Sequence, residues 1–184
     1  NTLTSGNFNW YLETAFKTED AINDPFATVV IAGDTTTGDR FINAPGSVLY
    51  SSLSYATRGF GLTLEAKRTE NFTFRTRPQV QLNRGMVNFL PPMARANTYR
   101  LLARYNAATQ EVGELAIQGD LRYAPSRNLR FNVNYSNIWN LDNDLLYREI
   151  YAEGYYKLSK ETSITAGFQY QQYNQEVFEF KPNV

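Results

Sequence analysis

The chain has 184 residues and a mass of 21.1 kDa, and its 18 Lys and Arg residues balance 18 Asp and Glu residues. It contains no His and no Cys, which excludes a Ser-His-Asp triad, a Cys nucleophile and a usual zinc site. The balanced charge, with few basic runs, argues against nucleic acid as a partner. We therefore expect one domain with no catalytic activity, no metal and no cofactor.

The start of the chain is informative through what it lacks. It opens with neither an initiator Met nor a charged segment followed by an apolar one, which predicts a mature product or a piece of a longer protein. The best apolar run, residues 27–32, is far shorter than the roughly 18 to 20 residues of a membrane-spanning helix. A mean hydropathy of −0.46 fits a soluble protein, but it also fits a transmembrane β-barrel, whose strands alternate apolar and polar residues.

Apolar and polar side chains alternate along seven segments, which is typical of β-strands with one apolar and one polar face. In chain order these segments are 8–17, 48–57, 60–67, 114–123, 129–136, 149–158 and 164–171. Residues 98–108 fit either a strand or a helix period, so the sequence predicts seven or eight strands. The chain is expected to be all-β.

The connections between these segments alternate in length. Short turns are expected at 58–59, 124–128 and 159–162, and long loops near 21–46, 71–97 (extending to about 112) and 139–145. Transmembrane barrels have this asymmetry. The strands also run about nine to eleven residues, the length that a tilted strand needs to cross a membrane, and many Tyr, Trp and Phe residues lie near strand ends, as in aromatic girdles.

The two faces of the predicted strands differ in chemistry. Charges of both signs gather with amides on one face, where they can satisfy one another inside a barrel. We expect the following residues to face the lumen: Glu13, Lys17, Glu65, Lys67, Glu114, Gln118, Asp120, Arg122, Arg130, Asn132, Asn134, Glu149 and Glu153. We expect these residues to face lipid: Phe8, Trp10, Leu12, Phe16, Phe60, Leu62, Leu64, Leu115, Ile117, Leu121, Leu129, Phe131, Val133, Ile164 and Phe168. An antiparallel sheet with one solvated face shows the same alternation.

Arginines are frequent in the middle of the chain. They are Arg68, Arg75, Arg77, Arg84, Arg95, Arg100 and Arg104. Two interpretations remain open. If residues 71–97 fold into the lumen, the arginines could form an anion-selecting constriction. Alternatively, they could latch the loop onto acidic residues of the lumen.

Two predicted hairpins carry a family resemblance. They read LRYAPSRNLRFNVNYSN and GYYKLSKETSITAGFQYQQY, and they resemble the periplasmic-turn hairpins of Gram-negative outer-membrane β-barrels. The Asn- and Tyr-rich segments NFNWYLETAFKTEDA and NFLPPMARANTY are similar to uncharacterised barrel proteins of Bacteroidota. The resemblance implies an outer-membrane location and an even number of antiparallel strands. The chain lacks the terminal aromatic residue usual in such barrels, which favours an internal segment of a larger barrel.

The sequence thus predicts a single all-β domain: an antiparallel up-and-down transmembrane β-barrel, or a segment of one. We expect it in the cell outer membrane as a porin-like structural, transport or assembly component of the cell envelope. Its expected partners are outer-membrane lipid and, within a larger assembly, other envelope proteins. The alternative is a secreted, soluble β-sandwich or β-barrel whose exposed Tyr and Trp residues bind carbohydrate.

Overall fold

The computed structural model describes residues 1–24, 28–37, 40–79, 85–88, 90–95 and 113–176. All ten elements in these ranges are β-strands. They are β1 (Thr2–Ser5), β2 (Phe8–Asp24), β3 (Thr28–Ile31), β4 (Asp34–Thr37), β5 (Arg40–Thr57), β6 (Phe60–Glu70), β7 (Gly113–Tyr123), β8 (Leu129–Trp139), β9 (Leu145–Lys157) and β10 (Ser163–Tyr173). This part of the chain contains no helix of the length and apolar character needed to cross a membrane.

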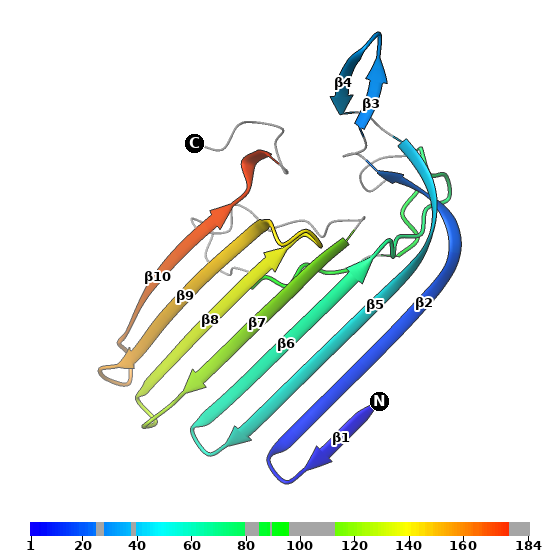
Figure 1. Cartoon of the computed structure of the whole chain (residues 1–184). Helices are drawn as coiled ribbons and strands as arrows, with labels where there is room; N and C mark the ends of the chain where they lie inside the picture. The colour runs from blue at the N-terminus through cyan, green and yellow to red at the C-terminus, as the bar shows by residue number, and fades with distance from the viewer. Residues whose placement is uncertain (25–27, 38–39, 80–84, 89, 96–112, 177–184) are drawn as a thin grey trace.

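Eight of the strands form one antiparallel sheet in the order β1-β2-β5-β6-β7-β8-β9-β10, and β3 and β4 form a separate hairpin (Figure 1). Neighbours in the sheet are therefore neighbours in sequence, apart from the inserted hairpin. The prediction of an all-β antiparallel fold is confirmed. Among the described residues the sheet is open, because β1 and β10 form its two edges and do not pair with each other.

The sheet contains all seven strands predicted from alternation, and it adds β1, which the sequence reasoning missed. Residues 21–46 depart more from the prediction. Much of the expected long loop is strand, because β2 continues to Asp24 and β5 begins at Arg40. A bulge between Lys17 and Asp20 places one extra residue in β2. The bulge interrupts the period of two on which the prediction relied. The expected long loop near 139–145 is also shorter, since β8 ends at Trp139 and β9 begins at Leu145.

The connections are tight at one end of the sheet and longer at the other (Figure 1). We call these the hairpin end and the loop end. The β5–β6 turn shows why the hairpin end is compact. Gly59 has a φ of +75°, and a Cβ there would lie 2.6 Å from the carbonyl oxygen of Ala124 in the neighbouring turn. Glycine satisfies both constraints because it lacks a Cβ.

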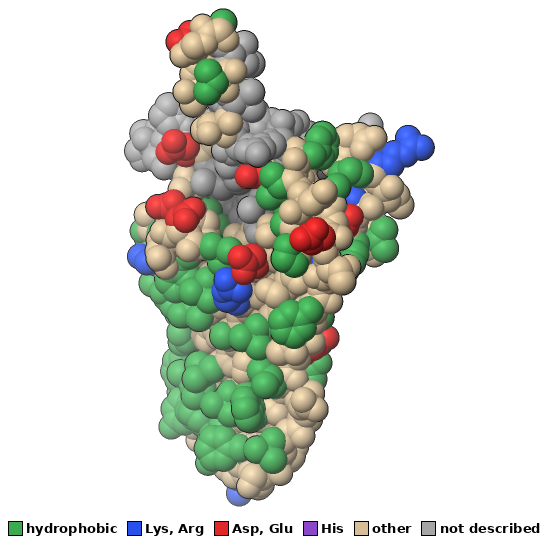
Figure 2. Space-filling model, turned by 45° about the vertical axis from the view of Figure 1, so that its right-hand side comes forward, with side chains coloured by type: hydrophobic (Ala, Val, Ile, Leu, Met, Phe, Trp, Pro, Cys, Tyr) green, Lys and Arg blue, Asp and Glu red, His purple; other side chains and the backbone are tan. Residues whose placement is uncertain are grey.

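The strand register gives the sheet one continuous apolar face. Leu53 pairs with Leu64, and Leu121 pairs with both Leu62 on β6 and Val133 on β8. Many of these side chains are exposed, and Figure 2 shows hydrophobic side chains gathered over the lower body of the molecule, with acidic and basic groups above them. A large exposed apolar face of this kind is typical of a surface that contacts another molecule or a membrane.

Most of the buried side chains lie on the opposite face of the sheet. There a small core of Met93, Ala116, Ile138, Leu146 and Tyr147 is surrounded by buried polar residues. Met93 belongs to the connection between β6 and β7, of which residues 71–79, 85–88 and 90–95 are described; we call these residues the cover segment. The cover segment therefore packs on the polar face of the sheet.

Candidate functional site: the covered polar face

The register places all the residues expected to face the lumen on one face of the sheet, which we call the polar face. Their burial differs along the strands. Five are buried: Lys17, Lys67, Glu114, Asn134 and Glu149. Five are half-buried, namely Glu65, Gln118, Asp120, Asn132 and Glu153, and three are exposed, namely Glu13, Arg122 and Arg130.

The residues expected to face lipid share the opposite face. Ten are exposed: Phe8, Trp10, Phe16, Leu64, Leu115, Ile117, Phe131, Val133, Ile164 and Phe168. Leu12, Phe60, Leu62, Leu121 and Leu129 are half-buried against their neighbours on the same face. Most of the large apolar side chains are thus on the exposed face of the sheet, and much of the charge is on the face that the cover segment partly buries.

A buried ion pair lies on the polar face where the cover segment meets β6 and β7. The Nζ of Lys67 lies 2.6 Å from Oε1 of Glu114, and the two side chains are 4% and 0% exposed. Lys67 pairs in register with Ala116, so Glu114 is its diagonal neighbour on the adjacent strand. Lys67 Nζ also donates a hydrogen bond of 2.8 Å to the carbonyl oxygen of Pro91. The pair thus joins two strands to the cover segment.

Lys17 makes a second attachment, on β2. Its Nζ donates a 2.8 Å hydrogen bond to the carbonyl oxygen of Thr73, lies 3.5 Å from the carboxylate of Asp20, and lies 5.3 Å from the ring centroid of Phe74. The backbones also approach closely here, since a Cβ on Gly46 would lie 2.5 Å from the carbonyl oxygen of Asn71. Gly46 therefore gives the cover segment room to lie against β5.

Tyrosines hold the carboxylates of the polar face. Tyr147 donates a 2.6 Å hydrogen bond to Glu149, and Tyr151 donates one of 2.6 Å to Glu153. Gln169 on β10 adds a 3.1 Å hydrogen bond to Glu149, and Gln171 donates one of 2.8 Å to the hydroxyl of Tyr147. Tyr50 donates to Glu65 across the β5–β6 pair in the same way.

Sequence reasoning missed these tyrosines, although a signal was present. Tyr147 precedes Glu149 by two residues and Tyr151 precedes Glu153 by two, and residues at i and i+2 of a strand share a face. The Tyr-x-Glu spacing occurs again at Tyr11, which donates a 2.6 Å hydrogen bond to Glu13. Such a repeat predicts that the Glu of each Tyr-x-Glu pair has a donor on its own strand.

The cover segment has an ordered structure of its own. Arg75 and Met86 form a β-bridge, and the Asn88 side chain accepts a hydrogen bond of 2.8 Å from the backbone N–H of Phe74. Burial lowers the pKa of the Arg75 guanidinium. At the C-terminal end of the cover segment, the guanidinium of Arg95 stacks on Tyr151, 3.7 Å from the ring centroid. The cover segment thus acts as a packed cap on the sheet.

The structure bears on the two interpretations of the arginine-rich stretch. The loop docks on the sheet, but the docking hydrogen bonds do not come from the arginines of the loop. Instead, Lys17 and Lys67 on the strands donate hydrogen bonds to carbonyl oxygens of the loop. Arg95 reaches the sheet through an aromatic ring, and Arg68 forms a 2.8 Å pair with Glu70 on the apolar face. Arg84, Arg100 and Arg104, together with the rest of 98–108, lie outside the described residues.

Several carboxylates of the polar face have partners, although buried atoms such as Thr69 Oγ1 and Asn132 Oδ1 make no hydrogen bond within the described residues. Within the described ranges, no group of three or more Asp or Glu residues has the geometry to hold a metal ion. Glu13, Glu65, Glu149 and Glu153 accept hydrogen bonds from tyrosine, and Glu114 pairs with Lys67. Such a network fixes the geometry of a polar surface and holds the cover segment on it.

The described residues define an all-β protein built on an open eight-stranded antiparallel sheet with a separate two-stranded hairpin. The chain belongs to the family of unknown function DUF6029, whose family model matches residues 1–183. No curated protein and no solved structure matches the chain.

Proposed function

We propose that this chain forms part of a β-barrel in the cell outer membrane, where it serves as a structural or transport component of the envelope. The observation that carries the proposal is the inverted distribution of side chains. Large apolar residues cover the exposed face, whereas Lys67, Glu114 and Glu149 are buried on the other. Lipid in contact with the exposed face would supply the apolar environment that water does not.

Strand length supports the same proposal. Strands β6, β7, β8 and β10 each have 11 residues. At about 3.3 Å per residue such a strand is roughly 36 Å long, and a tilt of about 45° reduces its span to roughly 25 Å. This span equals the height of the apolar band of outer-membrane barrels, about 25 Å. Strands of soluble domains are usually about five to six residues long.

Because the sheet is open among the described residues, we propose that these strands form only part of a barrel wall. Strands at the edge of a sheet leave backbone N–H and C=O groups without partners, and such groups are costly in lipid. We propose that additional strands pair with β10 at one edge and, at the other, with the part of β2 that the short strand β1 leaves uncovered. The partners of the chain are then outer-membrane lipid and the protein segments that supply those strands. The cover segment would act as a plug in the lumen.

The alternative of a soluble carbohydrate-binding sandwich requires a second layer over the apolar face. Within the described ranges the other sheet is the β3–β4 hairpin, which lies beyond the loop end of the strands in Figure 1. The exposed aromatic residues of the apolar face fit a membrane interface, where Trp and Tyr are enriched, better than they fit a carbohydrate-binding surface.

Two adjacent substitutions on β7 test the proposal. Ile117 is on the apolar face near the middle of the strand, and Gln118 is on the polar face beside Glu65. In lipid vesicles, Ile117→Arg should lower the free energy of unfolding in urea by about 2–4 kcal/mol, the cost of a cation near the bilayer midplane. Gln118→Arg should change it little, because Glu65 can pair with the new charge.

A soluble protein would show the opposite order, because a charge at exposed position 117 is readily hydrated. Equal effects of the two substitutions would contradict the assignment of the faces. The proposal also fails if the protein remains folded and monomeric in buffer without detergent or lipid.

A further inference from the structure

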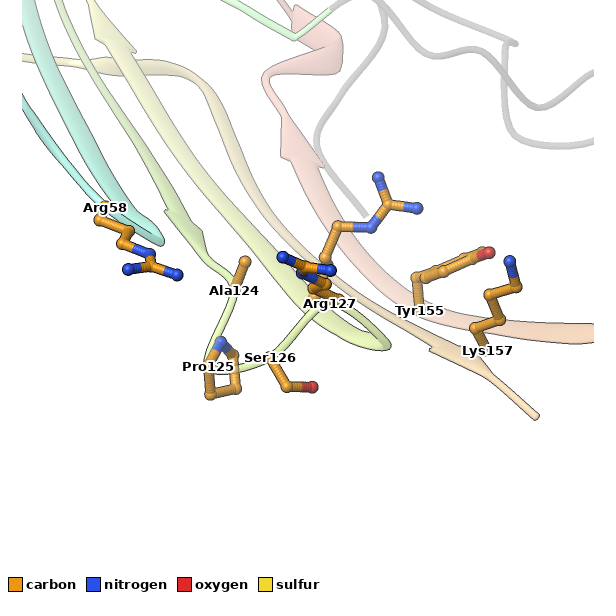
Figure 3. A pocket seen from close by; sticks show the side chains of 8 residues that line it. Arg58, Ala124, Pro125, Ser126, Arg127, Tyr155 and Lys157 are labelled. Carbon is orange, nitrogen blue, oxygen red and sulfur yellow. The ribbon is translucent and has the colours of Figure 1, made fainter. Parts of the chain in front are cut away.

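A basic cavity of about 620 Å³ opens at the hairpin end of the sheet, away from the cover segment. Its charged lining comes from three parts of the chain (Figure 3). Arg58 belongs to the β5–β6 turn, Arg127 to the β7–β8 turn with Arg130 just after it on β8, and Lys157 ends β9. Four cations thus line one cavity at the mouth of the polar face.

These four cations differ from the other charges of the polar face. In the described part of the chain, no ion pair joins Arg58, Arg127, Arg130 or Lys157 to a carboxylate. The adjoining hollow shows the contrast, since Arg122 lies 2.8 Å from the carboxylate of Asp120. Like charges held close together repel one another, and an anion among them would remove that cost.

The geometry prepares at least two of the cations for a ligand. The guanidinium of Arg130 lies 4.3 Å from the ring centroid of Tyr155, and stacking limits the orientations of its planar fork. The turn that carries Arg127 is held by Ser126, whose Oγ accepts hydrogen bonds from the backbone N–H groups of Asn128 and Leu129 at 3.3 and 3.2 Å. Less ordering entropy is then lost when a ligand binds.

We propose that this cavity binds a phosphate group. Guanidinium forks match the paired oxygens of phosphate, and three of the four cations are arginines. The volume of about 620 Å³ exceeds one phosphate and suits a phosphate ester with a small polar substituent. The same chemistry occurs in a phospholipid headgroup and in a soluble phosphate ester. The inference stands on the cavity alone and does not require the membrane location.

The first measurement is a calorimetric titration of the protein with glycerol 3-phosphate at low salt. We expect saturable binding that weakens as the salt concentration rises, because counter-ions screen the charges. Arg127→Gln and Arg130→Gln should each weaken binding about tenfold, the loss of a charge-assisted hydrogen bond. Arg130→Lys keeps the positive charge but loses the planar guanidinium, so its affinity for glycerol 3-phosphate should lie between those of the wild type and Arg130→Gln.

Lys160→Gln is the matched control. Lys160 lies in the β9–β10 turn at the same end of the molecule, carries the same charge, and is not part of the cavity lining. It should leave the binding constant unchanged. The positions changed in the cavity are exposed turn or strand-end residues, and thermal unfolding of each variant verifies that the fold is intact.

A second arm identifies the source of the phosphate. Vesicles of phosphatidylcholine with and without phosphatidylglycerol are titrated with the wild type and the same variants. Arginine-dependent enhancement by phosphatidylglycerol assigns the cavity to a lipid headgroup, and arginine-dependent binding of glycerol 3-phosphate alone assigns it to a soluble ester. If neither arm depends on Arg127 and Arg130, or if Lys160→Gln weakens binding as much as they do, the proposal is wrong.

Discussion

The charged side chains at the two ends of the polar face differ in burial and in pairing. At the loop end the cover segment buries Lys67 and Glu114, and both Lys67 and Lys17 have a carbonyl oxygen within hydrogen-bond distance and a carboxylate within ion-pair distance. At the hairpin end the surface is open, and Arg127 and Lys157 line a cavity without ion pairs. The difference follows from hydration, since a buried charge must be compensated by protein whereas an exposed one is compensated by water. The loop end is therefore built for stability, and the hairpin end is available to a ligand.

The strongest way to break this comparison is to remove the buried carboxylate. Glu114→Gln keeps the shape of the side chain but leaves Lys67 buried without its counter-charge. The free energy of unfolding should fall by about 3–5 kcal/mol, measured by urea denaturation in lipid or detergent. In the double variant Lys67→Met with Glu114→Gln, much of the loss should be recovered, since no unpaired charge remains. A Glu114→Gln loss below about 1 kcal/mol would mean that water reaches the pair.

A smaller effect is expected from pushing the cover segment off the sheet. Gly46→Ala places a Cβ 2.5 Å from the carbonyl oxygen of Asn71 and 3.0 Å from Cγ of Lys17. We expect a loss of about 1–3 kcal/mol, typical of an overpacked contact, and faster amide exchange at Val87, whose N–H bonds to Phe74 within the cover segment.

Gly61→Ala is the control for that substitution. Gly61 lies on β6, and a Cβ there meets nothing within 4 Å. Its stability should stay within about 0.5 kcal/mol of the wild type, the usual range for surface changes. If both alanine variants behave alike, the cover segment does not press on β5 at Gly46.

Among the substitutions that remove an interaction, the smallest effect should come from the exposed ion pair near the hairpin end. The side chains of Arg122 and Asp120 are 76% and 22% exposed, although their distance is only 2.8 Å. Arg122→Ala should cost less than about 1 kcal/mol, because water competes for both charges. Urea denaturation beside Glu114→Gln makes the comparison direct. A loss of stability as large as that of Glu114→Gln would show that water has less access to the Arg122–Asp120 pair than the exposed fractions of its side chains indicate.

Local periodicity predicted most of the sheet. Segments such as 114–123 and 129–136 alternate cleanly and are separated by a short turn, so strand, face and pairing partner all follow from the residues. The short strand β1 was missed because its four residues do not show the alternation well. The upper part of β2 was missed because the bulge after Lys17 reverses which residues share a face.

The candidate site was only partly predictable for a different reason. Which side chains share the polar face follows from parity within each strand. Which of them are buried depends on the cover segment, and its docking through the carbonyl oxygens of Thr73 and Pro91 leaves no pattern in side-chain types. The cavity at the hairpin end is formed by Arg58, Arg127 and Lys157, which are distant in sequence and meet only when four strands are paired.

The open edge of the sheet constrains how the protein can be assembled. Strand β10 presents 11 residues whose outer side faces no neighbouring strand in the described structure, beside an apolar face that water does not tolerate well. Such an edge adds any compatible strand that it meets, including that of a second copy. The proposed closure of the wall therefore requires that β10 be kept away from other copies until a partner strand arrives, and it makes the pairing of that edge a late step of folding.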